Sequence, residues 1–394
     1  MSREMRMSPE LEAFLRDLPL TDHHCHGVVE GELDRPGFED LINEGFDPPP
    51  AGTSHFESPI GLAIRRWCAP ALDLEPLADP ERYLERRAEL GAEEVNRRLL
   101  RAAGLGHLIV DSGYRSSEVT GVERTGELAG VPASEVVRLE AVAEDVAASG
   151  VDAAGYADAF REELERRCER AVGLKTIVAY RGGFAFDPRP PAAAEVVRAA
   201  ERWLAAGGRL TNPVLLRFGI YAGAELARDR GMPLQVHSGW GDPDLTLHLA
   251  NPSLLTDLVK ELGRMGVNVV FLHCYPYHRE AAYLAAVLPN VSFDVGEAIT
   301  YLGPSATRLL AEALELAPFT KQLYSSDAFG LAELYLVGAA QFRRGLAEVL
   351  GAWIADGRCS AADAERIARL VAVENAARIY PGRSPRSPAG DPVR

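Results

Sequence analysis

The stretch Thr21-Asp22-His23-His24-Cys25-His26 is the strongest single indicator of the fold in this chain. It follows the apolar lead Leu18-Pro19-Leu20, and together they predict a buried strand. His24 and His26 are two residues apart, so a strand places both imidazoles on one face. Such a pair offers two ligands for a divalent metal. An isolated pair is more often a hydrogen-bonded strand end, so the metal interpretation requires ligands from elsewhere.

The composition is that of a folded, acidic protein. The 394 residues are 47% hydrophobic and 25% charged, which is ample for a large core. A formal net charge of -15 without a long basic run argues against nucleic acid and against membrane surfaces as partners. We expect no spanning helix and no secretory signal. Five scattered cysteines predict free thiols in a reducing cytoplasm.

Beyond the first strand, short apolar strands alternate with amphipathic helices. Strands are predicted at 107–111, 136–140, 173–180, 233–237, 268–273, 291–295 and 323–327, and helices at 8–17, 192–206, 254–265, 280–288 and 306–314. With the first strand this makes eight units, which predicts an α/β fold of the (β/α)8 TIM-barrel type. The rival is a doubly wound open sheet, but no Gly-rich phosphate turn follows the first strand.

Residues 27–106 are too long for one strand-to-helix loop. They contain the turn Asp47-Pro48-Pro49-Pro50 and helical stretches that end with 81–103. We expect a helical insertion that lies over the mouth of the site as a lid or substrate wall. Residues 1–381 are predicted to form one domain, and 382–394, rich in Pro, Ser and Gly, a disordered tail.

Polar side chains recur where the predicted strands stop. They are His24, His26, Asp111, Glu140, His237, His273, Asp294 and Asp327. The carboxyl ends of the strands carry the active site in this kind of barrel, and a purely structural set would be scattered through the helices as well. Histidines from strands one and five and the aspartate of strand eight therefore predict a metal site formed by His24, His26, His237 and Asp327.

Imidazoles with a carboxylate suit Zn2+ best, with Mn2+ or Fe2+ as alternatives, in one or two ions. Such a metal activates water and polarises a carbonyl. Asp327 can bind the metal, accept the proton of the water and pass it to the leaving group. His273 is either a further ligand or a donor to the developing oxyanion. Asp327 and His273 are thus the predicted catalytic residues.

Loops at the strand ends supply the predicted substrate-binding residues. The guanidinium fork of Arg181 suits a substrate carboxylate, and Trp240 and Asp242 flank the ligands. The alternatives are packing for Trp240 and a turn for Asp242. Arg138 and Glu140, two residues apart on strand three, are expected to pair with each other.

These motifs resemble the amidohydrolase superfamily: D-x-H-x-H on the first strand, His on strands five and six, and Asp on strand eight. The stretches 174–181, 235–244, 325–327 and 374–380 resemble the amidohydrolase-2 group, and within it the amidohydrolase domain fused to glutamine synthetase in nodulin-like proteins. The resemblance implies a metal-dependent hydrolase, most often of C–N bonds. Decarboxylases and uronate isomerases share this barrel and its ligands.

Some members of the superfamily bridge two metals with a carboxylated lysine on strand four. The resemblance places Lys175 at about that position and makes it a further predicted ligand. The alternatives are a free amine that contacts substrate, or a side chain that extends out between strand and helix.

The sequence therefore predicts a metal-dependent amidohydrolase that cleaves an amide-type C–N bond of a small molecule. A decarboxylase or isomerase acting on a small carboxylate is the first alternative. A catalytically inert metal-binding barrel that serves as a protein partner is the second. A homo-oligomer is compatible with the sequence.

Overall fold

Seven parallel strands lie side by side in chain order in the computed structural model, which describes residues 8–381. They are β1 (Leu20–Cys25), β2 (Leu105–Asp111), β3 (Ala133–Arg138), β4 (Gly173–Thr176), β5 (Leu234–Ser238), β6 (Val269–His273) and β7 (Val291–Phe293). The first seven predicted strands are therefore present. β3, β4 and β7 end before their predicted ends. A helix begins at Leu139 directly after β3, a 3-10 turn begins at Val178 soon after β4, and a helix begins at Gly296 soon after β7.

The eighth predicted strand, 323–327, is an irregular segment that nevertheless closes the barrel. On one side, Leu323 N donates to Phe293 O of β7 at 3.0 Å. On the other, His23 N of β1 donates to Tyr324 O at 3.2 Å. Backbone bonds to both β7 and β1 exclude the open sheet and establish the (β/α)8 arrangement.

Side-chain bonding explains why this last segment forms no regular ladder. The carboxylate of Asp22 accepts the backbone N–H of Ser326 at 2.9 Å. In a regular strand, a backbone carbonyl of the neighbouring strand would accept that N–H. The next residue, Asp327, has a φ of 51°, which is outside the β region. The sequence pattern therefore predicted correctly where residues 323–327 lie, but wrongly predicted that they form a regular strand.

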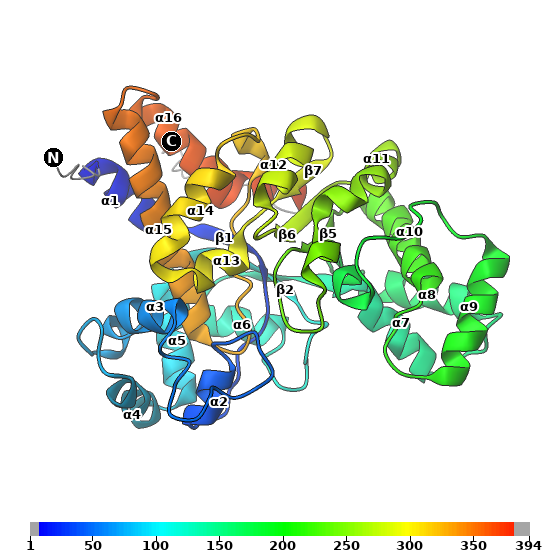
Figure 1. The fold of residues 1–394 in the computed structure, drawn as a ribbon, viewed down its shortest axis with the longest axis horizontal. Helices are drawn as coiled ribbons and strands as arrows, with labels where there is room; N and C mark the ends of the chain where they lie inside the picture. Colours follow the sequence, from blue (N-terminus) through cyan, green and yellow to red (C-terminus); the bar gives the residue numbers. More distant parts are fainter. Residues whose placement is uncertain (1–7, 382–394) are drawn as a thin grey trace, which may run out of the picture.

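Helices surround the strands (Figure 1). They are α1 (Pro9–Asp17), α2 (Arg35–Asp40), α3 (Pro59–Trp67), α4 (Pro80–Leu90), α5 (Ala92–Ala102), α6 (Val122–Ala129), α7 (Leu139–Ala148), α8 (Tyr156–Arg167), α9 (Ala193–Ala206), α10 (Pro213–Arg230), α11 (Thr256–Arg264), α12 (His278–Val287), α13 (Gly296–Tyr301), α14 (Ala306–Ala313), α15 (Ala332–Ala355), α16 (Ala361–Arg369) and α17 (Asn375–Ile379). The predicted tail, 382–394, lies outside the described residues.

Residues 27–106, between β1 and β2, contain α2 to α5, which lie together at the lower left of Figure 1. The predicted helix over 81–103 is two helices, because Gly91, at a φ of 78°, ends α4 and begins α5. α5 packs against α15 of the barrel. A function for these helices as a lid stays a prediction.

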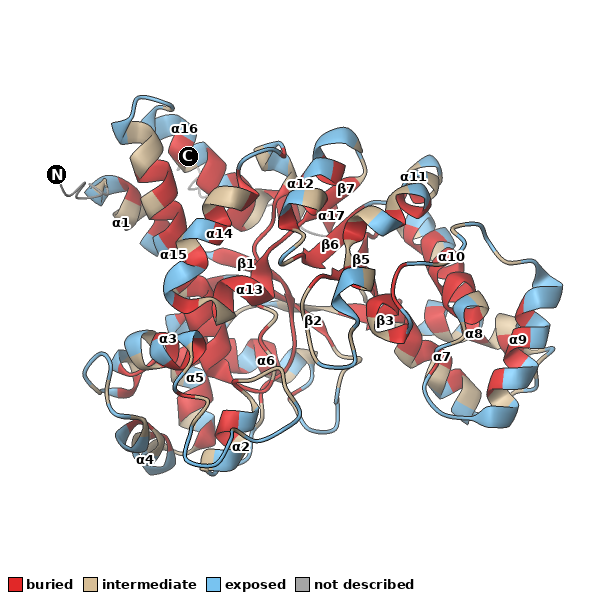
Figure 2. Cartoon of the chain, in the orientation of Figure 1, coloured by how far each residue is buried: buried red, intermediate tan, exposed pale blue. Residues whose placement is uncertain are grey.

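The strands are the most buried part of the molecule (Figure 2). All six residues of β1 are buried, including Asp22, His23 and His24. Buried polar groups require partners, so a strand this polar indicates a bonded network rather than packing alone. The five cysteines are free thiols. Within residues 8–381, no helix has the length and hydropathy needed to span a membrane.

One buried ion pair ties α4 to α15. Arg87 pairs with the fully buried Glu333, whose carboxylate also accepts the Tyr83 hydroxyl at 2.8 Å. Arg87→Met leaves that carboxylate without its cation, so we expect the free energy of unfolding to fall by about 3–5 kcal/mol in urea denaturation. The matched control is Arg82→Met on the same helix. Arg82 is half-exposed, and we expect a change below about 1 kcal/mol. Equal effects of the two substitutions would contradict this role.

Candidate metal centre

The ends of β1, β4 and the closing segment bring four predicted side chains together. His24 Nε2 lies 3.1 Å from Asp327 Oδ1, and His26 Nε2 lies 3.5 Å from the same oxygen. Lys175 Nζ lies 2.7 Å from His24 Nε2. Strand alternation places His24 and His26 on one face, while the Cys25 thiol points away, to a backbone oxygen of β2.

The histidines of β5 and β6 lie beside this group. His273 Nε2 is 3.3 Å from Asp327 Oδ2, and its ring centre is 5.5 Å from that of His24. The ring of His237 is 4.7 Å from the ring of His273, but its Nε2 lies 3.1 Å from the backbone oxygen of Trp240. His237 is therefore adjacent to the centre, with one ring nitrogen directed to the loop after β5.

Two overlapping sets of ligand atoms are compact enough to hold an ion. One is His24, His273 and Asp327, and the other is His24, His26 and Asp111; the atoms of each set lie within 4.8 Å of one another. Asp111 belongs to the strand-end pattern of the sequence but not to the predicted ligand set.

The chemistry of these atoms fits a divalent metal. Both ring nitrogens of His273 are buried and make no well-formed hydrogen bond among the described residues. Buried polar atoms are rarely left in that state, and ligation is one of the ways to satisfy them.

Electrostatics favours neutral imidazoles and an ionised carboxylate. Burial, together with the charge of Lys175, lowers the pKa of His24 to about 3. Burial also lowers the pKa values of His237, His273 and Lys175. The pKa of Asp327 falls well below its usual range, since His273 and the β1 histidines outweigh the effect of burial. These are the protonation states that metal binding requires.

A salt bridge continues the network from the centre to β3. Lys175 Nζ lies 3.5 Å from Asp111 Oδ2, and Arg138 donates to the same oxygen at 2.6 Å. The contact that Arg138 makes is thus with Asp111, and Glu140, the partner predicted from the sequence, acts on it through its charge alone. β3 stops at Arg138, so Glu140 falls in the first turn of α7, where it accepts the Thr176 hydroxyl at 2.5 Å.

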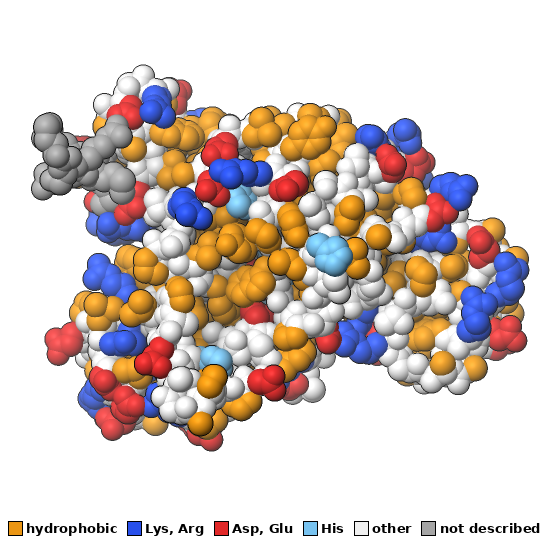
Figure 3. Space-filling view, in the orientation of Figure 1, with side chains coloured by type: hydrophobic (Ala, Val, Ile, Leu, Met, Phe, Trp, Pro, Cys, Tyr) orange, Lys and Arg blue, Asp and Glu red, His pale blue; other side chains and the backbone are white. Residues whose placement is uncertain are grey.

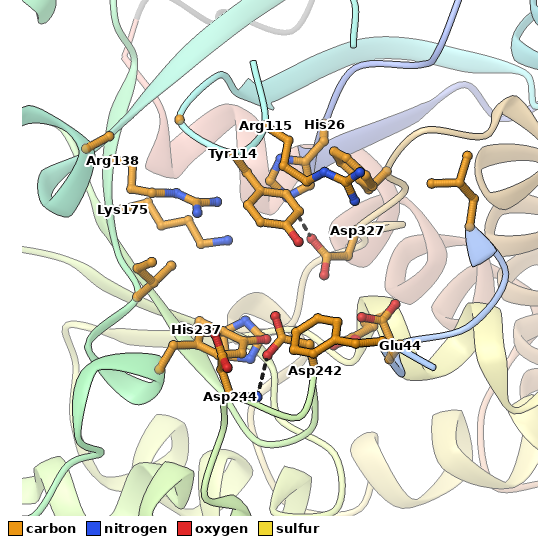
Figure 4. A pocket seen from close by; sticks show the side chains of 18 of the residues that line it. His26, Glu44, Tyr114, Arg115, Arg138, Lys175, His237, Asp242, Asp244 and Asp327 are labelled. Carbon is orange, nitrogen blue, oxygen red and sulfur yellow. Dashed lines mark hydrogen bonds and ion pairs between the residues drawn. The ribbon is translucent and has the colours of Figure 1, made fainter. Parts of the chain in front are cut away.

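Lys175 directs its amine into the cavity (Figure 4). This excludes the alternative in which the lysine extends outward between strand and helix. Carboxylation of Lys175 and direct contact with substrate both stay predictions.

A cavity of about 480 Å3 opens over the predicted ligands (Figure 4). The strand ends and the loops after them, helices α7 and α13, and the segment 40–46 of the helical insertion supply its wall. Lining residues with polar side chains include His26, Glu44, Tyr114, Arg115, Arg138, Glu144, Lys175, Tyr180, Arg181, Arg209, His237, Asp242, Asp244, Glu297, Tyr301 and Asp327.

The predicted substrate-binding residues divide between two neighbouring hollows. Arg181 and Asp242 line the cavity over the ligands. Trp240 lines a second, more apolar hollow that shares Asp242 and Tyr301 with the first, and its ring packs edge-on against Tyr301 at 5.1 Å. Figure 3 shows hydrophobic side chains gathered at the centre of this face, with charged side chains mostly around them.

Sequence reasoning missed the acidic part of the cavity. Glu44 lies in the insertion, where no periodic pattern singles it out. Glu297 lies three residues after Asp294, at the start of α13, and the strand-end pattern stops at Asp294. A search that extended past each strand into the following turn would have found Glu297.

This TIM barrel brings together, at the carboxyl ends of its strands, histidine and carboxylate side chains of the kinds that bind a divalent metal. The family model described as amidohydrolase (Amidohydro_2) matches residues 118–382. The chain belongs to this amidohydrolase family, as its sequence motifs predict.

Known proteins agree with this membership. The chain is 32% identical over 222 residues to the protein fluG of Emericella nidulans, and the match spans 53% of this chain but 25% of fluG. A Lactobacillus casei ATCC 334 protein provisionally described as a metal-dependent hydrolase is 30% identical, with a TM-score of 0.84 over 95% of this chain and 98% of that one. A uronate isomerase of Bacillus halodurans C-125 shares the fold, with 15% identity and a TM-score of 0.65 over 94% of this chain and 95% of that one.

The ligand set predicts how metal content responds to substitution. His24 belongs to both compact sets, so we expect His24→Ala to lower bound zinc at least tenfold after dialysis, as measured by elemental analysis. The control is His248→Ala, which removes an exposed imidazole and should leave zinc content unchanged. Full zinc content in His24→Ala would refute the assigned ligand.

Proposed function

We propose that this protein is a metal-dependent amidohydrolase that cleaves an amide-type C–N bond of a small molecule, with zinc as its metal. The observation that carries the proposal is the set His24, His273 and Asp327 at the cavity. Family membership and the Lactobacillus casei relative support it. A small-molecule substrate and a cytoplasmic location accord with the net charge of -15 and the free thiols.

A divalent ion in this set would lower the pKa of a water molecule to about 7 and polarise the substrate carbonyl. Asp327 is the base in this proposal. Its carboxylate is ionised and directs Oδ1 to the β1 histidines and Oδ2 to His273. It accepts a proton from the attacking water and delivers it to the leaving nitrogen.

His273 acts beside Asp327, and we propose it as a ligand. Its Nε2 belongs to the same compact set as Asp327 and is otherwise without a well-formed bond in the described chain. The second set, with His26 and Asp111, lies around the same His24, which supports a two-ion centre. Lys175, between His24 and Asp111, would join it as a carbamate.

The second candidate function is decarboxylation or isomerisation of a small carboxylate. Four arginines line the cavity, Arg115, Arg138, Arg181 and Arg209, and they favour an anionic substrate. The products separate the two reactions: hydrolysis releases ammonia or an amine, decarboxylation releases carbon dioxide, and isomerisation releases neither.

Asp327→Asn removes the proposed base while keeping nearly the same shape. We expect kcat to fall at least about 10³-fold in an assay of ammonia or amine release, with thermal stability within a few degrees of wild type. Asp257→Asn, an exposed aspartate on α11, serves as the control and should retain full activity. Retained turnover in Asp327→Asn would refute the role of this carboxylate.

A further inference from the structure

The cavity carries opposite charges at its two ends. Arg138 and Lys175 lie across the cavity from Glu44 (Figure 4). Arg181 lines the same cavity, and burial together with the charges of Arg209 and Arg138 lowers its pKa. Glu297 and Glu44 both line the cavity, and burial together with the charge of Glu44 raises the pKa of Glu297. A ligand that fits this arrangement is anionic at one end and cationic at the other.

Arg181 is the group at the cationic end whose hydrogen-bond donors are only partly paired. Its side chain is 7% exposed, and its one ion pair with the described residues is to Glu144, 3.2 Å from one terminal nitrogen. The other two guanidinium nitrogens, Nε and Nη1, are buried and have no hydrogen-bond partner within residues 8–381. Burying a charged group with two unpaired donors costs free energy, unless a ligand accepts hydrogen bonds from those donors. A carboxylate has the geometry to do so.

Glu297 is its counterpart at the acidic end. The residue is 3% exposed, and its Oε2 is buried and unpartnered in the described part of the chain. Glu44, beside it, hydrogen-bonds Tyr301. Burial, with the charges of Asp327 and Asp242, raises the pKa of Glu44 to about 7. Burial, with the charge of Glu44, raises the pKa of Glu297 well above its usual range. A cationic group placed between them would offset both effects.

We propose that the substrate is a small zwitterion of the amino-acid type, whose carboxylate binds Arg181 and whose ammonium group binds Glu297 and Glu44. This deepens the proposed function and rests on it, because the scissile amide would belong to an amino-acid derivative. Hydrolysis then breaks the C–N bond, forms a C–O bond to the oxygen of water and leaves the water proton on the departing nitrogen.

Binding of probes that contain no amide tests the inference without turnover. The zinc-loaded full chain is titrated calorimetrically with L-norvaline and 5-aminopentanoate, which carry both charges at two separations. Pentanoate and pentylamine each carry one of the charges. We expect at least one zwitterion to bind about tenfold or more tightly than either singly charged probe.

Two substitutions test the cationic end and the acidic end of the cavity independently. Arg181→Met should weaken the bound zwitterion and pentanoate at least tenfold and leave pentylamine unchanged. Glu297→Gln should weaken the zwitterion and pentylamine and leave pentanoate unchanged. Arg181→Lys retains the charge without the fork and should bind with intermediate affinity, which keeps the test valid if Arg181→Met does not fold. Arg189→Met, at an exposed arginine, is the control and should change nothing.

Equal affinity for all four probes would overturn the inference, and so would a loss of pentylamine binding in Arg181→Met. The outcome is separable from that of the proposed function. Selective zwitterion binding without hydrolysis of any amino-acid amide would refute only the reaction. Hydrolysis of uncharged amides without selective zwitterion binding would refute only the substrate class.

Discussion

The site depends on two buried carboxylates that hold the backbone at two strand ends in an unusual conformation. Asp327 and His273 have φ values of 51° and 68°, a left-handed region that costs a non-glycine residue roughly 1–2 kcal/mol. Asp22 accepts both the N–H and the hydroxyl of Ser326, immediately before Asp327. Asp294 accepts the N–H of His273 itself at 2.7 Å. These bonds fix the peptide groups that aim both side chains into the centre.

The two carboxylates differ in charge state because their partners differ. Burial raises the pKa of Asp22 to about 7, and the bonds from Ser326 reduce that effect without cancelling it. Burial acts on Asp294 in the same way, but His23, 2.7 Å away, outweighs it and brings the pKa to about 2. β1 therefore supports the site twice: His24 and His26 are the proposed ligands, and its other polar residues, Asp22 and His23, bond the neighbouring segments.

Features fixed by local pattern could be predicted from the sequence, and features fixed by distant partners could not. β1, β5 and β6 each carry histidine at or near the carboxyl end, so the position of these strands and the meeting of their histidines could be predicted from the pattern. The irregular last segment follows from a bond between Asp22 and Ser326, 304 residues apart, which no local pattern encodes. Glu44 and Glu297 enter the cavity from a loop and a helix start, outside any strand period. Gly91 did mark a helix break that the sequence interpretation overlooked.

Anomalous diffraction from crystals of the zinc-loaded protein, recorded at the zinc edge, tests the central claim most directly. The account predicts a peak at the carboxyl ends of the strands, about 2.0–2.2 Å from a ring nitrogen of His24 and an oxygen of Asp327. A second peak near His26 and Asp111 would fit the two-ion centre. Zinc bound only elsewhere, with His24 and Asp327 still in mutual contact, would contradict it.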